Sequence, residues 1–226
     1  MSNNLLDVLS PQDGAQAGKV YGVVVGIVTN NKDPDNHGRV KVRFPWLSDQ
    51  EESWWARIAT MMSGPSRGSY FLPEVDDEVL VAFDHGDMRF PYVVGGLWNG
   101  KDAPPKNNSD GENNLRVIHS RSGHVLTFDD KKGAENFEVK SSSGHIVRLD
   151  DKPGSEKVEI IDKTGSNHIT IKSMDNSMAL ECLGKLTIKA LAIEITSNTD
   201  VKVEGITVNV NGSAMVKIQG GMVMIN

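Results

Sequence analysis

Cysteine, long apolar runs and an excess of positive charge are all missing from this chain. Its 226 residues contain one cysteine, Cys182, so no intrachain disulfide framework can form. No apolar run approaches the roughly 20 residues that a membrane-spanning helix needs. The 24 Lys and Arg are outnumbered by 30 Asp and Glu, for a net charge of −6. This balance argues against a nucleic-acid-binding protein, which normally carries a basic face. The first residues lack a basic segment followed by an apolar one, so we expect no secretory signal peptide.

The patterns of common active sites are also missing. The chain has no Gly-x-Ser-x-Gly, no Cys–His nucleophile pattern and no phosphate-binding loop. Residues 33–38 begin like a calcium loop, but Phe44 stands where an EF-hand needs Glu, so we interpret them as an Asx- and Gly-rich hairpin loop. The pairs Asp129–Asp130 and Asp150–Asp151 fit solvated turns better than a glycosidase site, because adjacent side chains point in opposite directions. We therefore predict no enzymatic activity and no cofactor.

What the chain does contain is a series of short strands separated by turns. Alternating apolar residues predict strands at 20–29, 38–44, 54–59, 78–83 and 92–97. Five strands in some 80 residues, with little helical periodicity, predict a small closed barrel of the OB type at 18–100. Residues 1–17 are polar and are expected to form an N-terminal arm. Residues 101–114, rich in Pro, Asn, Asp and Gly, are expected to form a linker.

A repeat of 21 residues follows the linker. Gly123, Gly144 and Gly165 lie 21 residues apart, and each begins a unit of turn, amphipathic strand, acidic turn and second strand, such as 136–140 or 157–161. His124 and His145 occupy equivalent positions, and His168 is a candidate third. In a trimer each could form a ring of imidazoles suited to an ion. The alternative is a half-exposed polar residue beside a turn. We predict a β-prism at 115–180.

The last residues carry the most regular pattern of the chain. Apolar and polar residues alternate, and one apolar position recurs at intervals of 7 or 8, a sign of stacked β-structure. Strands this short cannot bury a core within one chain, so we predict that three chains intertwine into a triple-stranded β-helix needle at 181–226. The expected trimer core consists of Ile188, Ile195, Val203, Val210, Ile218 and Ile225.

Three ordered motifs then resemble a known family. They are Gly-Arg-Val-x-Val-x-Phe at 38–44, Pro-x-x-x-Asp-Glu-Val-x-Val-x-Phe at 73–83 and Gly-Asp-x-x-x-Pro-x-Val-x-Gly at 86–95. This pattern resembles the OB domain of central spikes of contractile injection machines: baseplate assembly protein V of phage tails, VgrG proteins of type VI secretion, and the spikes of phage-tail-like extracellular particles. Asp76 departs from the family, which often has Gly there, so the turn is expected to differ. Neither a lysozyme-like domain nor the large N-terminal hub region of VgrG proteins is recognisable.

The resemblance implies an all-β homotrimer with a mechanical function. It would dock on a hub protein at the end of the inner tube, contact that tube indirectly, and meet the target membrane only on firing, when it punctures the envelope. It would be made in the bacterial cytoplasm and assembled in a phage-like particle or secretion machine. Some phage spikes end in a His-x-His pair that binds iron, and this chain has none. Its end instead implies either contact with a PAAR-like tip protein through Met222, Met224 and Asn226, or a tip closed by its own side chains.

Two further features leave an alternative open. Trp54, Trp55 and Trp98 could stack on nucleic-acid bases, but the acidic charge makes core packing or contact with a protein hub the better interpretation, and we expect no nucleic acid. The alternative function is a receptor- or glycan-binding β-solenoid tail protein. It would be supported by exposed aromatic residues on the prism, where Phe128 and Phe137 are the candidates.

Overall fold

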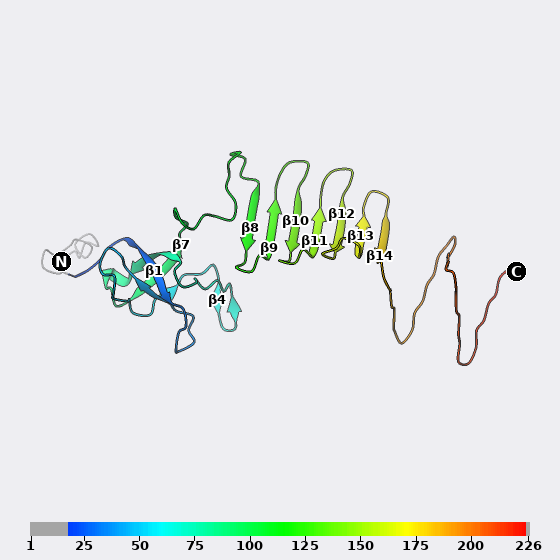
Figure 1. Ribbon diagram of the computed structural model, residues 1–226, viewed down its shortest axis with the longest axis horizontal. Helices are drawn as coiled ribbons and strands as arrows, with labels where there is room; N and C mark the ends of the chain where they lie inside the picture. Colours follow the sequence, from blue (N-terminus) through cyan, green and yellow to red (C-terminus); the bar gives the residue numbers. More distant parts are fainter. Residues whose placement is uncertain (1–17, 225–226) are drawn as a thin grey trace, which may run out of the picture.

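A computed structural model of the chain describes residues 18–224, and in them almost all regular structure is β. Figure 1 shows three parts in chain order: a folded head, a row of antiparallel strands, and a trailing C-terminal segment. The all-β prediction is confirmed. The arm at 1–17 and the positions Ile225 and Asn226 lie outside the described residues.

The head is built on a five-stranded sheet with the order β2-β1-β6-β7-β3. All neighbours are antiparallel except β3 and β7. The strands are β1 (Val23–Asn30), β2 (Lys41–Arg43), β3 (Arg57–Ile58), β6 (Glu78–Phe83) and β7 (Pro91–Gly96), and a short 3-10 turn, η1 (Asp84–Gly86), joins the last two. Val40 and Ala56 exchange backbone hydrogen bonds of 3.0 and 2.7 Å, which connect the two outer strands, so the sheet returns on itself.

Apolar side chains from these strands fill a core within the head. In β6 every second residue is buried, as strict alternation requires when one face of a strand meets the core. Gly26 lets β1 and β2 approach closely, because a Cβ there would lie 2.2 Å from Val42 Cγ1. The buried core residues are Val28, Val40, Val42, Phe44, Ala56, Val79, Val81, Phe83 and Val93.

The predicted head strands agree with the structure to different degrees. The strand at 78–83 is confirmed to the residue, and those at 20–29 and 92–97 are confirmed with ends shifted by one to three residues. The strand predicted at 54–59 is regular only over Arg57–Ile58. A hairpin of β4 (Ser63–Gly64) and β5 (Arg67–Gly68) lies in a segment that the sequence indicated only as turn.

Seven antiparallel strands, each paired with the next in the chain, form the second part. Each has five residues: β8 (Leu115–His119), β9 (Val125–Asp129), β10 (Asn136–Lys140), β11 (Ile146–Asp150), β12 (Lys157–Ile161), β13 (His168–Lys172) and β14 (Ser177–Glu181). The predicted strands 136–140 and 157–161 are confirmed without any shift.

The turns at the two edges of this sheet are joined by hydrogen bonds to different kinds of acceptor. On one edge, backbone amides of Asp130, Asp151 and Ser173 donate to carbonyls one turn back in the stack, at 2.9–3.1 Å. On the other edge, side chains accept the equivalent hydrogen bonds, as described below. The first turn of this second edge also contacts the head, where Arg121 Nη1 lies 3.0 Å from Glu74 Oε1.

No strand is present in residues 182–224, although their apolar residues alternate. The segment leaves the free edge of β14 and runs in long zigzags away from the sheet (Figure 1). All of its residues are exposed. An extended segment without hydrogen-bonded neighbours cannot close a core by itself, because its backbone groups and apolar side chains have no partners.

Candidate assembly interface

One face of the seven-stranded sheet is almost entirely apolar. In the observed register, the second and fourth residues of successive strands line up in two rows on one face. Thirteen of these fourteen residues are apolar, and many are exposed. The rows are Arg116, Phe128, Phe137, Leu149, Val158, Ile171 and Met178, and beside them Ile118, Leu126, Val139, Val147, Ile160, Ile169 and Leu180.

The opposite face of this sheet is stabilised by ion pairs. Arg148 Nη2 donates to Glu138 Oε2 at 2.5 Å, and Arg148 Nη1 lies 3.4 Å from Glu159 Oε2. Glu159 is buried and also accepts from Lys157 Nζ at 2.9 Å. The hydrogen bond that Arg148 donates to Glu138 raises the pKa of Arg148. This face therefore has its own polar partners, whereas on the apolar face only Arg116, at its first strand, has one, in an ion pair of 2.9 Å with Asp130 among residues 18–224.

The C-terminal segment continues the apolar surface as two stripes. The described members of the expected trimer core, Ile188, Ile195, Val203, Val210 and Ile218, are 64–75% exposed. A second stripe lies two residues before each of them and is 49–56% exposed: Leu186, Ile193, Val201, Val208, Val216 and Val223. The sequence contains this second stripe at the same intervals of 7 and 8, but our sequence reasoning missed it. Residues i and i+2 of an extended chain share a face, so both stripes can enter one core.

The expected tip contacts lie at the far end of this segment. Met222 and Met224 are strongly exposed, while Asn226, like Ile225 of the core stripe, lies outside the described residues. Methionine side chains adapt to irregular apolar surfaces. An exposed pair at the end of the chain is therefore suited to a protein contact, either with other copies or with a separate tip protein.

A groove on the head combines aromatic and basic side chains. The Arg57 guanidinium lies over the Tyr92 ring, 4.5 Å from its centroid, and donates a hydrogen bond to the Tyr92 hydroxyl. Trp54 is 66% exposed, and Phe90 is exposed beside it in the lining of this groove, which has a volume of about 600 Å3. Within the described part of the chain no carboxylate forms an ion pair with Arg57. Trp, Tyr and Arg are the residues most often found at energetic centres of protein interfaces.

The tryptophans named from the sequence are not part of the buried core. Trp55 is half-buried, with Arg39 and Lys41 cations 5.9 and 5.7 Å from its ring centroid. Trp54 and Trp98 are exposed. Of the two alternatives for these residues, the structure contradicts core packing for Trp54 and Trp98 and leaves contact with another protein.

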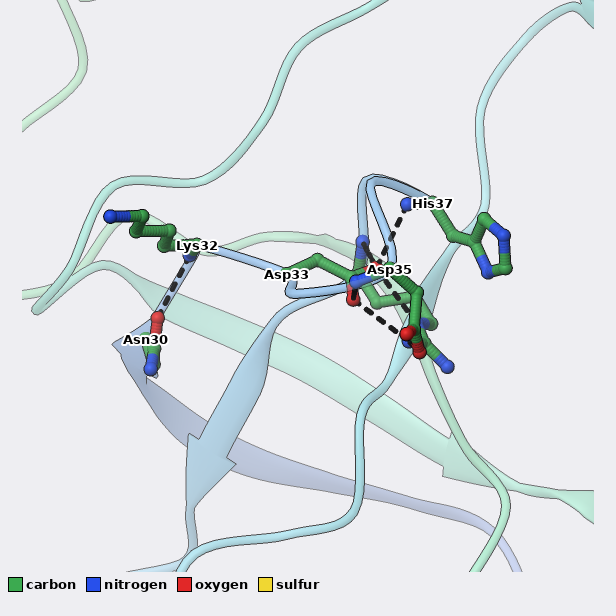
Figure 2. A network of polar contacts seen from close by, with 6 residues as sticks. Asn30, Lys32, Asp33, Asp35 and His37 are labelled. Carbon is green, nitrogen blue, oxygen red and sulfur yellow. Dashed lines mark hydrogen bonds and ion pairs between the residues drawn. The ribbon is translucent and has the colours of Figure 1, made fainter.

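The loop at 33–38 is closed around one carboxylate, as Figure 2 shows. Asp33 accepts hydrogen bonds from the backbone amides of Asp35, His37 and Arg39 at 3.1–3.2 Å. It also accepts two from the Arg39 guanidinium, both at 2.8 Å. The Arg39 bonds hold the pKa of Asp33 well below its usual range. The Asx-rich hairpin loop interpreted from the sequence is present, and its carboxylate is saturated by donors of its own loop.

The turn histidines bind backbone amides. His124 Nδ1 accepts from the Ser142 amide, and His145 Nδ1 from the Lys163 amide, both at 3.2 Å. The third equivalent position is held by Asn167, whose Oδ1 accepts from the Leu183 amide at 3.2 Å. The proposal of His168 as the third member is wrong, because His168 is the first residue of β13. The third turn is one residue longer than the others, so its equivalent position is Asn167. Among residues 18–224 no three His, Cys, Asp or Glu side chains gather closely enough to hold a metal ion.

Asp76 adopts the backbone conformation that glycine takes most readily. Its φ is +76°, in the left-handed region. Its amide donates to the Val28 carbonyl at 2.8 Å. The chain therefore has a glycine-like backbone conformation at this position, with a residue less suited to it.

Comparison with known proteins agrees with this architecture. Residues 24–98 match the type VI secretion system/phage-baseplate injector OB domain. The chain is 34% identical over 126 residues to type VI secretion system spike protein VgrG3 of Vibrio cholerae, which covers 52% of this chain and 12% of that protein. It is 30% identical over 133 residues to spike protein VgrG1a of Pseudomonas aeruginosa, covering 54% of this chain and 21% of that protein.

A third relative is named for a different activity. The actin cross-linking toxin VgrG1 of Vibrio cholerae is 31% identical over 134 residues, which are 55% of this chain and 12% of the toxin. The chain thus spans only about an eighth to a fifth of the length of these relatives. In the described residues no helix is long and apolar enough to cross a membrane. The chain therefore carries an injector OB domain at 24–98 and is similar to VgrG spike proteins over about half of its length.

Proposed function

We propose that the chain is the structural central spike of a contractile injection machine and works as a homotrimer. The observation that carries this proposal is the exposed apolar surface that runs from the seven-stranded sheet into the two C-terminal stripes. Soluble single chains rarely expose an apolar surface of this extent, because its burial is worth about 25 cal/mol per Å2. Partner copies of the same chain would cover it.

Three chains around one axis fit this surface. Three seven-stranded sheets with their apolar faces inward would form the β-prism, and the ion-paired faces would remain outside. Three segments 181–226 would wind into a β-helix with Ile188, Ile195, Val203, Val210, Ile218 and Ile225 in its core, joined by the second stripe. The neighbouring chains would supply the backbone hydrogen bonds that one chain lacks and remove the exposed strand edges.

The groove on the head is our proposed contact with the hub. An unpaired Arg57 on Tyr92, with exposed Trp54 and Phe90, favours a protein surface that presents a carboxylate and an apolar group. We expect Trp54→Ala to leave a trimer that no longer enters assembled particles. Trp98→Ala is the matched control, because Trp98 is equally exposed but does not line the groove.

Mechanical stiffness is the function that this arrangement supports. A contracting sheath would drive the inner tube forward, and the spike would concentrate that force on a small area of the target envelope. Such a needle must resist unfolding under load, so the height of the unfolding barrier is what matters. Met222, Met224 and Asn226 would meet a PAAR-like tip protein. No catalytic role is part of the proposal. The toxin named among the relatives is far longer than the region it shares with this chain.

Surface binding by the sheet is a weaker proposal. A receptor- or glycan-binding protein would use aromatic side chains on the outer face of the prism. Phe128 and Phe137 instead contact each other, with ring centroids 4.9 Å apart, and lie in the apolar rows that a trimer would bury.

Electron microscopy of assembled particles tests the spike function. In cells that encode the chain, labelled antibody against the head should mark one end of the inner tube. Loss of the chain should abolish firing, and the wild-type chain should restore it. Label along the sheath, or firing without the chain, would contradict the proposal.

A further inference from the structure

We propose that His124 and His145 make one turn edge of the seven-stranded sheet sensitive to acid. On this edge, one hydrogen bond from a backbone amide to a side-chain acceptor joins each repeat to the next, and we call each of these hydrogen bonds a tie. Imidazole Nδ1 is the acceptor in the first two ties, to Ser142 and Lys163. The Asn167 amide oxygen is the acceptor in the third, to Leu183. The two kinds of acceptor respond differently to protons.

The three acceptors are placed alike. His124, His145 and Asn167 each come directly before a strand, β9, β11 and β13. In both residue types the accepting atom is bonded to Cγ, so Oδ1 of asparagine and Nδ1 of histidine reach the same point. The turns are also alike: Ser120 and Ser141 hydroxyls accept from the His124 and His145 amides at 3.0 and 2.9 Å, and Asp162 Oδ1 accepts from the Asn167 amide at 3.1 Å.

Protonation removes only the histidine acceptors. A neutral imidazole can accept at Nδ1, but an imidazolium carries N–H on both nitrogens and would set a donor against the backbone donor. The His124 and His145 ties are therefore present while the rings are neutral and are lost when the rings are protonated. The Asn167 tie has no titrating group.

The other charged groups around this edge would not cause the same loss of hydrogen bonds in acid. Arg121 is paired with Glu74, and the Asn167 amide lowers the pKa of Asp162 to about 2, so that carboxylate stays ionised between pH 5 and 8. His168 Nε2 lies 3.6 Å from Glu181 Oε2, and the two form an ion pair only when the imidazole is protonated. Other charged or titratable groups are His119 and Lys140, beside the first turns, Lys163, whose amide is itself a donor, and Cys182, directly before Leu183.

In acid, this sheet would therefore lose hydrogen bonds at some turns and keep them at others. Acid would release the two ties next to the head and leave the tie at Leu183, where the sheet passes into the C-terminal segment. The opposite edge would stay closed, because its ties join backbone amides to backbone carbonyls.

Hydrogen exchange at single amides, read by mass spectrometry on the full-length protein, tests this inference. Protection is compared at pH 8 and pH 5 after correction for the intrinsic exchange rate. Ser142 and Lys163 should lose protection by about fivefold or more, as expected for one net hydrogen bond. Leu183, and Asp151 and Ser173 on the opposite edge, should change less than twofold. Equal changes at all five amides, or none at Ser142 and Lys163, would overturn the proposal.

Paired substitutions separate the Nδ1 acceptor from the imidazole as a whole. The double variant His124→Asn, His145→Asn keeps an acceptor on Cγ, so Ser142 and Lys163 should stay protected at pH 5 as at pH 8. The double variant His124→Gln, His145→Gln places its amide one bond further out, so both amides should already exchange about fivefold faster at pH 8. If the Asn variant still loses protection in acid, the histidines are not the cause. The readout does not depend on the hub, the tip or the number of chains.

Discussion

The head and the C-terminal half of this chain bury their apolar residues in opposite ways. In the head, β1, β6, β7 and their neighbours enclose a core of nine buried residues within one chain. From Leu115 onward the apolar residues are as regular in sequence, yet most stay exposed, and none from Leu183 to Met224 is buried. Regular alternation specifies which side chains share a face, but only a second layer decides whether that face becomes a core. The head supplies its own second layer, and under the proposed function other copies of the chain would supply it for the C-terminal half.

The largest effect is expected from a charge in the C-terminal stripe. Val210→Asp should prevent trimer formation, because three carboxylates would be buried together without partners. Asn209→Asp, at the adjacent polar position, should leave the trimer intact. Light scattering on both variants measures this. A well-folded trimer of Val210→Asp would show that position 210 does not lie in the trimer core.

Truncations in the two regions should behave differently. Val81→Ala should lower the free energy of unfolding of the head by about 2 kcal/mol, through lost burial and a small cavity. Ile160→Ala, on the apolar face of the sheet, should instead shift a transition whose midpoint rises with protein concentration. Urea titrations at two protein concentrations distinguish them. A midpoint independent of concentration for Ile160→Ala would mean that this face has no partner.

Acid should weaken the head through Asp33. Its pKa is lower in the folded protein than the ordinary value of 3.8, so its stabilising effect is complete above that value and is lost as the pH falls below it. The melting temperature of the wild type should therefore fall between pH 4 and pH 2. In Asp33→Asn it should be lower at pH 7 and fall less steeply in acid. Equal slopes for both proteins would show that the loop contributes nothing to acid stability.

The smallest effect is expected at the left-handed turn. Asp76→Gly should raise the stability of the head by about 0.5 kcal/mol, because the strain of φ at +76° exceeds the entropy that glycine adds to the unfolded chain. Differential scanning calorimetry detects a shift of this size. A decrease in stability would mean that the Asp76 side chain has a stabilising role of its own.

The sequence predicted best where alternation was bounded by strong turns. The strands at 78–83, 136–140 and 157–161 agree to the residue for this reason. The sequence prediction failed where a strand depends on contacts outside the local sequence pattern. The β4–β5 hairpin is built from Ser, Gly and Arg without an apolar face, and β3 is short because only two of its residues meet the parallel neighbour β7.

The assembly surface was predicted in part. The sequence analysis predicted one C-terminal stripe from its intervals of 7 and 8 residues. It did not predict the second stripe, which lies two residues earlier and has the same intervals. The order of His and Asn on the turn edge required the structure, because one extra residue in the third turn makes Asn167 the third acceptor, and not Ser166, to which a strict 21-residue period points, or His168. The groove around Arg57 brings together 54–57 and 89–92, which are distant in sequence.

The mass of the full-length chain in solution tests the central claim most directly. Light scattering should give three times 24.6 kDa, about 74 kDa, and the oligomer should survive SDS without boiling. A stable monomer of 24.6 kDa that keeps its apolar surface in water would contradict the homotrimeric spike.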